Sequence, residues 1–261
     1  MKIVATHIYQ FKIPMVPFTI ATGTMHYAQN MLIQVTTDEG ITGYGECSAF
    51  PMIVGETQQS CYLLAKDFAN FWKGKNPLAI TERLKELDLI IAGNYTAKSA
   101  FDMALYDIAA KHANQPLYAF LGGQQKSIES DLTIGIDFPQ KMAGQAIDFV
   151  AKGVRIIKVK LGKHPTEDVE RIKAIRTAIG DEIILRIDAN QGWSSNDALG
   201  VLTNLSKYNI EFCEQPMHKY QDDFLPALCK ASPIKIMADE SVFTHHDARK
   251  LIAQKACDSI N

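Results

Sequence analysis

Three acidic residues at nearly equal intervals carry the strongest chemical signal in the sequence. Asp188, Glu214 and Asp239 lie 26 and 25 residues apart (214 − 188 and 239 − 214), and each follows a short, mostly apolar run. Such an interval is the length of one strand–helix–loop unit. On successive parallel strands, acids at one depth converge at the carboxyl ends, where barrel enzymes have their active sites. The spacing therefore predicts one shared acidic site.

Three converging carboxylates repel one another unless a positive charge lies among them. A hard divalent cation with oxygen ligands fits this need, and Mg²⁺ in proteins commonly uses a few carboxylates together with water and substrate. The alternative is three unrelated acids at helix N-termini, which the equal spacing disfavours.

Two lysines precede the acids on a predicted strand. Lys158 and Lys160 are two residues apart, so their side chains point to the same side. Beside a metal, two ammonium groups lower each other's pKa, and one lysine could then be neutral near pH 7 and act as a base. It would remove the α-proton of a metal-bound carboxylate, because the resulting enediolate is stabilised electrostatically. The alternatives are lysines that snorkel from a strand end and a Schiff-base aldolase, which would not need three carboxylates.

Strand and helix patterns alternate from residue 130 onward, which predicts a parallel sheet. Expected strands cover residues 131–136, 154–160, 183–188, 210–214 and 234–239. Expected helices cover residues 139–152, 166–179, 195–208, 222–231 and 244–254, and residues 258–261 resemble the opening of a sixth strand. The shared position of the polar residues favours a TIM-type (β/α) barrel over an open sheet. We therefore expect residues 124–261 to form about five and a half βα units, a barrel that is C-terminally incomplete as given.

Residues 1–123 predict an α+β capping domain. A strand over 2–13 is expected to end at Pro14, and residues 31–37 and 41–46 flank a hairpin turn at Asp38–Gly40. Two loops rich in Gly, Thr and Met, 18–30 and 49–56, are surface connections or flaps over an active site. Helices are expected over 58–72, 80–91 and 96–113, the last with Thr96 as N-cap and Lys98 on its wet face.

The composition is that of an ordinary globular protein. The chain has 261 residues, a formal net charge of −2 and five cysteines without C-x-x-C spacing. This charge gives no reason to expect nucleic acid or an anionic membrane as a partner. An odd number of cysteines, no signal-peptide core and no apolar run near ~20 residues favour reduced thiols and a cytoplasmic setting.

The polar motifs, in their order along the chain, resemble those of the enolase superfamily. Lys-x-Lys, Asp-x-Asn, Glu-Gln-Pro and Ala-Asp-Glu-Ser follow successive predicted strands, behind the predicted α+β cap. The resemblance is to the muconate-lactonising branch and most closely to the dipeptide epimerases. It extends along nearly the whole chain, including residues 94–100, 104–107 and 188–193. It implies an isomerase that uses Mg²⁺ and inverts the α-carbon of the C-terminal residue of a dipeptide through an enediolate.

The resemblance also implies roles for single residues. Lys160 would be an acid/base on one face of the α-carbon, with Lys158 on the substrate carboxylate, Thr133 in contact with the substrate, and Asp188, Glu214 and Asp239 as Mg²⁺ ligands. Segments 18–25 and 50–55 would be the two specificity loops of the cap. Similar epimerases selective for Ala-Glu carry an arginine where this chain has Gly23, which implies a dipeptide with a small first and an uncharged second residue. Trp193 is expected to support its loop, and we expect a homo-oligomer.

The resemblance leaves one half of the reaction outside the residues given. The lysine on the opposite face would follow Asn261 in an Asn-x-Lys pattern, and an Asp-x-Asp that holds the substrate's ammonium group would lie on the eighth strand. The alternatives to a dipeptide epimerase are another superfamily enzyme (a cycloisomerase, an o-succinylbenzoate synthase or an N-acylamino acid racemase) and an inactive truncated fragment that binds metal.

Overall fold

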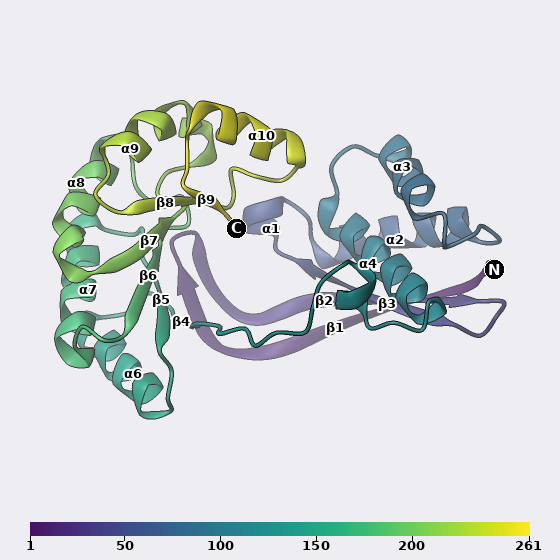
Figure 1. The fold of residues 1–261 in the computed structure, drawn as a ribbon, viewed down its shortest axis with the longest axis horizontal. Helices are drawn as coiled ribbons and strands as arrows, with labels where there is room; N and C mark the ends of the chain where they lie inside the picture. Colours follow the sequence, from purple (N-terminus) through teal and green to yellow (C-terminus); the bar gives the residue numbers. More distant parts are fainter. The chain divides into compact units, whose positions relative to one another are not determined.

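The structure, a computed structural model, describes all residues from Met1 to Asn261 and divides into two compact units. The first unit consists of Met1–Val16 and His26–Ile128, and the second of Pro17–Met25 and Glu129–Asn261 (Figure 1). The short segment Pro17–Met25 belongs to the second unit although the residues on both sides of it belong to the first. None of the helices combines the length and the apolar character needed to cross a bilayer.

The first unit combines a three-stranded sheet with helices. The strands are β1 (Ile3–Ile20), β2 (Gly23–Thr37) and β3 (Thr42–Ala49), in the order β1-β2-β3, and β2 pairs with β3 in antiparallel orientation. The helices are α1 (Pro51–Val54), α2 (Gln58–Trp72), α3 (Ile80–Ile90), α4 (Tyr95–His112) and α5 (Leu117–Phe120). Helix α2 begins with a capping box in which Thr57 and Ser60 exchange side-chain and backbone hydrogen bonds.

Two predictions for the first strands were wrong. Strand β1 does not end at Pro14 but runs on to Ile20, and most of the predicted loop 18–30 lies in strands β1 and β2. Strand β1 lies at the edge of the three-stranded sheet, the place in a sheet where proline is tolerated best. The second predicted loop contains the short helix α1.

The start of α4 also differs from the prediction. Its N-cap is Asn94, in the left-handed region at φ 54°, and not Thr96. The backbone N–H groups of Thr96 and Ala97 donate to the buried Glu56 carboxylate at 3.1 and 3.2 Å. Lys98 is buried and not on a wet face, because its ammonium group pairs with Asp88 at 2.9 Å.

Helix α4 packs against β3 through small residues. A Cβ atom on Gly43 would lie 2.2 Å from the carbonyl oxygen of Ala104, and one on Gly45 would lie 1.8 Å from that of Ala100. Only glycine therefore allows this approach of helix and strand. The contact buries both alanines completely.

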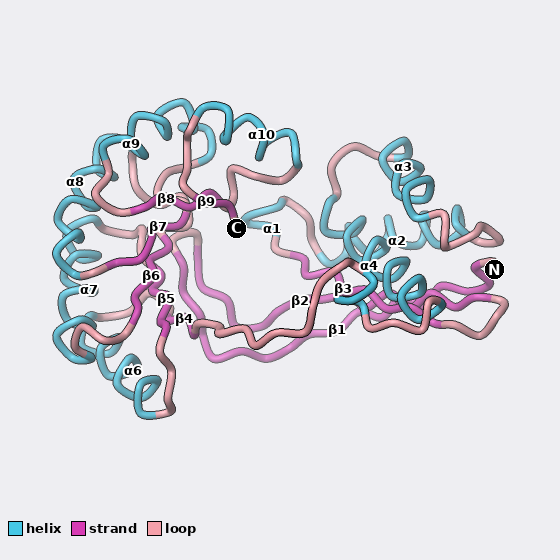
Figure 2. Tube along the Cα trace, in the orientation of Figure 1, coloured by secondary structure: helices cyan, strands magenta, loops and turns pink.

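The second unit is built from repeated strand–helix pairs. Its six strands form one sheet in chain order, with parallel pairing throughout: β4 (Leu132–Ile134), β5 (Ile156–Lys160), β6 (Ile184–Asp188), β7 (Ile210–Glu214), β8 (Lys235–Ala238) and β9 (Ser259–Ile260). The helices are α6 (Pro139–Ala151), α7 (Pro165–Ile179), α8 (Ser195–Leu205), α9 (Leu225–Ala231) and α10 (His245–Gln254). Figures 1 and 2 show them along the outer side of a curved row of strands, as in the wall of a (β/α) barrel. The predicted sixth strand is present as β9.

The side chains of β5 alternate between the buried core and the opposite face, which carries the two lysines of the candidate site. Ile157 and Val159 are completely buried in the core, whereas Lys158 and Lys160 between and after them remain partly accessible. Successive side chains of a strand point to opposite faces, so both lysines lie on the face away from Ile157 and Val159.

Candidate active site

Strand register brings the predicted lysines and acids together. Lys160 on β5 is the register partner of Asp188 on β6, which is in turn the partner of Glu214 on β7. Glu214 pairs with Met237 on β8, and Asp239 follows two residues later. The Asp239 carboxyl group interacts with those of Asp188 and Glu214. The three acids that the spacing predicted to converge therefore do so.

The two lysine ammonium groups lie among the carboxylates. Lys158 Nζ lies 2.7 Å from Glu214 Oε2 and 2.9 Å from Asp188 Oδ2. Lys160 Nζ lies 2.5 Å from the same Asp188 oxygen. Asp188 is 0% exposed and Glu214 3%. Such a dry environment strengthens each of these interactions.

Burial and charge change the proton affinities of these groups. Burial raises the pKa of Glu214 to about 7, and the nearby Asp188 adds to this effect. Burial and Asp188 likewise raise the pKa of Asp239. Burial alone would raise the pKa of Asp188, but Lys160 and Lys158 outweigh it and lower that pKa. The cluster thus holds more buried negative charge than its lysines neutralise.

Lys158 behaves differently from the sequence-based expectation of a lowered lysine pKa. Burial lowers the pKa of Lys158, but the carboxylates of Asp188 and Glu214 outweigh burial and raise it. The expectation was for two ammonium groups beside a bound metal. In the structure, each ammonium group lies against a carboxylate instead.

A fourth carboxyl group, Glu240, was not singled out from the sequence. Asn190 Nδ2 donates to Glu240 Oε1 at 3.1 Å, whereas Asn190 Oδ1 and Glu240 Oε2 are buried without a partner. Burial raises the pKa of Glu240 to about 7, with further contributions from Asp239 and Asp188. Its position inside Ala-Asp-Glu-Ser, next to Asp239, was the signal that could have identified it.

The donor set fits a hard divalent cation. No group of three or more His, Cys, Asp or Glu side chains is arranged to hold a metal ion as the side chains stand. Yet the carboxyl groups of Asp188, Glu214 and Asp239 interact with the two ammonium groups here, and their oxygen atoms are ligands of the kind that Mg²⁺ prefers. The assignment of Asp188, Glu214 and Asp239 as its ligands stays a prediction.

Glu214 and Gln215 also connect neighbouring strand ends. Asn261 Nδ2 donates to Glu214 Oε1 at 3.2 Å. Gln215 Oε1 accepts the backbone N–H groups of Asp239 and Ser241 at 2.9 and 3.2 Å. This buried amide therefore fixes the loop that carries Asp239, a role that no sequence pattern indicated.

The predicted substrate contact Thr133 lies beside the lysines. It is partly exposed on β4 and is the register partner of Lys158. The tip of the β1–β2 hairpin, which belongs to the same unit, packs on the ends of β4 and β5. Thr19 accepts a hydrogen bond from the Ile136 N–H at 2.8 Å, and a Cβ on Gly162 would lie 3.0 Å from that of Ala21. The segment predicted as the first specificity loop is thus fixed to the strand ends that carry Thr133 and Lys160.

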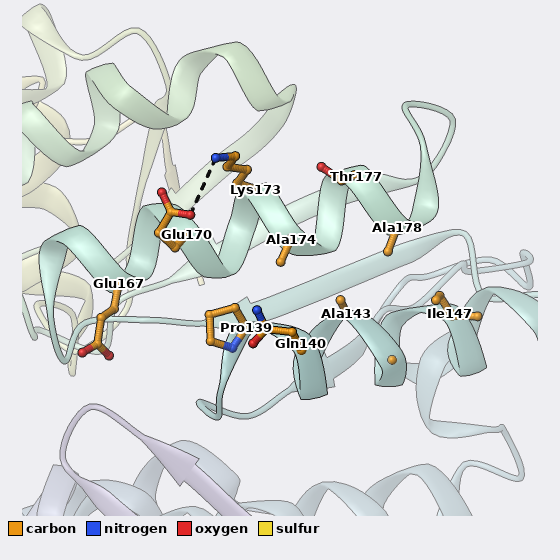
Figure 3. A pocket seen from close by; sticks show the side chains of 11 residues that line it. Pro139, Gln140, Ala143, Ile147, Glu167, Glu170, Lys173, Ala174, Thr177 and Ala178 are labelled. Atoms are coloured by element: carbon orange, nitrogen blue, oxygen red, sulfur yellow. Dashed lines mark ion pairs between the residues drawn. The ribbon is translucent and has the colours of Figure 1, made fainter.

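A separate groove lies between helices α6 and α7 (Figure 3). Small side chains such as Ala143, Ala174 and Ala178 line it, together with the ion pair between Glu170 and Lys173 at 3.8 Å. No lysine or acid of the candidate site belongs to its lining.

Comparison with known proteins identifies the family. The model for the N-terminal domain of mandelate racemase and muconate lactonizing enzyme matches residues 3–122, and that for enolase C-terminal domain-like proteins matches residues 141–261. The chain belongs to the enolase superfamily. Within this superfamily it is 47% identical over 246 residues to the D-Ala-D/L-Ala epimerase of Cytophaga hutchinsonii, covering 94% of this chain and 67% of the relative.

Other superfamily members that the chain resembles are also dipeptide epimerases. A hydrophobic dipeptide epimerase of Enterococcus faecalis is 38% identical, with 100% of this chain and 74% of the relative covered. The structure of the Cytophaga hutchinsonii dipeptide epimerase, complexed with Mg and D-Ala-L-Val, matches with a TM-score of 0.99 and 44% identity, covering 100% of this chain and 72% of that one. These relatives are epimerases, so the chain falls among the isomerases of the superfamily, with the cap and the TIM-barrel fold that its motifs predicted.

Proposed function

We propose that the chain is a magnesium-dependent dipeptide epimerase that inverts the α-carbon of the C-terminal residue of its substrate. The observation that carries this proposal is the placement of Lys160 against Asp188, at the carboxyl end of β5, in a chain similar to known dipeptide epimerases. The proposed substrate has a small N-terminal residue and an uncharged second residue.

The proposed chemistry assigns one task to each side chain. Lys160, in its neutral form, takes the α-proton from one face of the α-carbon, and its ammonium form returns a proton to that face. The Lys158 ammonium group donates hydrogen bonds to the substrate carboxylate, beside the Thr133 hydroxyl. Inversion also requires a proton donor on the opposite face, so Lys160 serves only half of the reaction.

The proposed magnesium ligands are Asp188, Glu214 and Asp239. When bound, the ion would supply positive charge that stabilises the negative charge developing on the substrate carboxylate. Its charge would also favour the ionised form of Glu214, whose pKa is raised to about 7 by burial and by the nearby Asp188.

Magnesium is therefore expected to stabilise the protein against heat. At a Mg²⁺ concentration 100 times the dissociation constant, stabilisation is about 2.7 kcal/mol. Differential scanning calorimetry with EDTA and with Mg²⁺ measures the rise in Tm. Glu214→Gln should reduce this rise, whereas Asp181→Asn, on a side chain that is 87% exposed, should keep it. An equal Mg²⁺-dependent rise in Glu214→Gln would refute its assignment as a ligand.

The proposed preference for an uncharged second residue rests on the hairpin tip. Gly23 lies at the start of β2 in the segment that packs on the strand ends, and it offers no cation to a substrate side chain. A relative 47% identical to this chain is an epimerase of D-Ala-D/L-Ala, which fits the same preference.

Gly23→Arg is expected to change the substrate preference. In the wild-type protein, kcat/KM for Ala-Ala and Ala-Val should exceed that for Ala-Glu by about tenfold or more, because a buried substrate carboxylate would lack a partner. The arginine should raise the relative value for Ala-Glu by about tenfold, equivalent to one ion pair of 1.4 kcal/mol. Gly200→Arg, on the exposed side of α8, adds the same charge elsewhere and should change nothing. A wild-type preference for Ala-Glu would contradict the proposed specificity.

We further propose that the protein works in the cytoplasm as a homo-oligomer. All five cysteines are free, as expected in a reducing compartment. Sedimentation velocity of the purified protein tests the homo-oligomer, and a monomer at micromolar concentration would exclude it.

A further inference from the structure

One buried carboxylate near the candidate site has no role in the proposed chemistry. Asp168, in the first turn of α7, is completely buried. Its Oδ2 accepts the backbone N–H of Gly162 and the indole N–H of Trp193, both at 2.9 Å. Its Oδ1 accepts a hydrogen bond from Arg171 at 2.7 Å. The carboxylate thus has three donors from three different segments.

Two of those donors, Gly162 and Trp193, belong to the loops that follow strands of the site. Gly162 lies two residues after Lys160, and Trp193 lies five residues after Asp188. Through its Nε, Arg171 also donates to the backbone carbonyl of Asp137 at 3.0 Å, in the loop after β4. Asp168 and its arginine therefore connect the loops after β4, β5 and β6, the strands that carry Thr133, Lys160 and Asp188.

The loops after β5 and β6 are packed backbone to backbone at this point. The Leu161 N–H donates to the Asp188 carbonyl at 2.8 Å. A Cβ on Gly162 would lie 2.1 Å from the carbonyl oxygen of Ala189, and one on Gly192 would lie 2.2 Å from that of Gly162. Because neither loop has room to move toward the other, a displacement at Gly162 is passed to the end of β5.

Stability alone does not explain a charged group at this position. Arg171 is also nearly buried and bonds Glu167 at 2.7 Å as well as Asp168. Buried ion pairs often contribute no more to stability than apolar residues of the same volume. Apolar residues could not hold the N–H groups of Gly162 and Trp193, from two different loops, at a fixed separation as this one carboxylate does.

We propose that Asp168 is a positioning residue that holds Lys160 in register with Asp188 through Gly162 and Trp193. Its side chain bonds Gly162, Trp193 and Arg171, none of which is a proposed acid/base or magnesium ligand. This inference rests on the proposed function, since it assigns Lys160 to proton transfer. Outer hydrogen-bond partners of this kind typically contribute 10–100-fold to activity.

Asp168→Asn is the first test. Its amide keeps the shape of the side chain, but its N–H₂ group faces either both loop donors at the Oδ2 position or Arg171 at the Oδ1 position. In both orientations the remaining oxygen is neutral and is a weaker acceptor than the carboxylate. The expected result is a loss of about 10–100-fold in kcat for α-proton exchange of Ala-Ala, with KM within about threefold of wild type. Asp197→Asn, in the first turn of α8, removes an equivalent helix-terminal charge that joins no two loops, and kcat should stay unchanged.

The indole resonances provide a readout that does not depend on activity. The chain has two tryptophans, and Trp72 Nε1 is buried without an acceptor whereas Trp193 donates to Asp168. In ¹⁵N-edited spectra, Asp168→Asn should move the Trp193 N–H resonance upfield and leave that of Trp72 in place. If this variant does not fold, Trp193→Phe removes the same donor with the ring largely retained, and a loss of about tenfold in kcat is expected.

Three results would overturn the assignment. They are a folded Asp168→Asn with wild-type kcat, a Trp193→Phe with wild-type kcat, and an unshifted Trp193 resonance in Asp168→Asn. A wild-type protein that exchanges no dipeptide α-proton would overturn the proposed function together with this inference. If the wild-type protein exchanges the α-proton and Asp168→Asn exchanges it at the same rate, only the role of Asp168 is overturned.

Discussion

Replacement of Lys160 by alanine is expected to abolish α-proton exchange for the substrate epimer whose α-proton faces Lys160, and to spare the other epimer in a protein that also carries the base of the opposite face. Lys160 Nζ lies 2.5 Å from Asp188 Oδ2 at the carboxyl end of β5, so it can reach one face of a substrate held there. Loss of a positioned general base costs 10²–10⁴-fold. We therefore expect exchange to fall by about 10²–10⁴-fold for either Ala-L-Ala or Ala-D-Ala, but not for both.

Proton NMR in D₂O measures this loss for each epimer separately. The fold should survive, because Asp188 keeps its contact with Lys158 at 2.9 Å. Lys163→Ala, on an exposed lysine of the same loop, serves as the matched control. Wild-type exchange of both epimers by Lys160→Ala would remove Lys160 from the reaction.

Replacement of Gly45 by alanine is expected to destabilise the first unit by about 3 kcal/mol, at the upper end of the overpacking range. The new Cβ would lie 1.8 Å from the carbonyl oxygen of Ala100 and 2.7 Å from its carbonyl carbon. Both atoms belong to the backbone of α4, so no side-chain rotation can relieve the clash. Helix α4 would have to move away from β3 and expose the buried Ala100 and Ala104.

Urea unfolding followed by circular dichroism measures this free energy change. Gly200→Ala in α8 is the matched control, because its Cβ would meet nothing within 4 Å. This control should be neutral or stabilise the protein by up to about 1 kcal/mol. A Gly45→Ala variant that unfolds at the wild-type urea concentration would show that α4 does not pack on β3 in this way.

The sequence was sufficient to predict features that follow from local periodicity. Lys158 and Lys160 share a face because side chains alternate along a strand, and Asp188 and Glu214 meet because equal units place them at equal depth. The sixth strand was recognisable from only four residues at the end of the sequence, because they follow the helix of the fifth unit, where the repeat places the next strand.

The features that the sequence did not predict depend on contacts between distant segments. Thr96 was expected to cap α4, but Glu56, 40 residues earlier, accepts its N–H. Lys98 was expected at the surface, but it is buried, and its ammonium group bonds the Asp88 carboxylate and the Ile91 carbonyl. Asp168 has the periodicity of an ordinary helix acid, and its role depends on two loops that only the fold brings to it.

The pKa of Lys158 likewise depends on contacts that the sequence does not show. The nearness of Lys158 and Lys160 follows from their spacing in the sequence, whereas the burial of Asp188 and Glu214 directly against them does not. Because Asp188 and Glu214 lie against Lys158, its pKa is raised although burial opposes the shift. Trp193, in contrast, supports its loop as expected, since it is buried and donates to Asp168.

Transfer of the α-proton of a dipeptide is the central claim, and deuterium incorporation tests it most directly. The protein is incubated in D₂O with Mg²⁺ and Ala-Ala, and the α-proton of each residue is followed by NMR. We expect deuterium at the α-carbon of the C-terminal residue and none at the N-terminal residue, with exchange that stops when EDTA is added. If all three dipeptides, Ala-Ala, Ala-Val and Ala-Glu, retain the C-terminal α-proton in the presence of Mg²⁺, the chain is not a dipeptide epimerase.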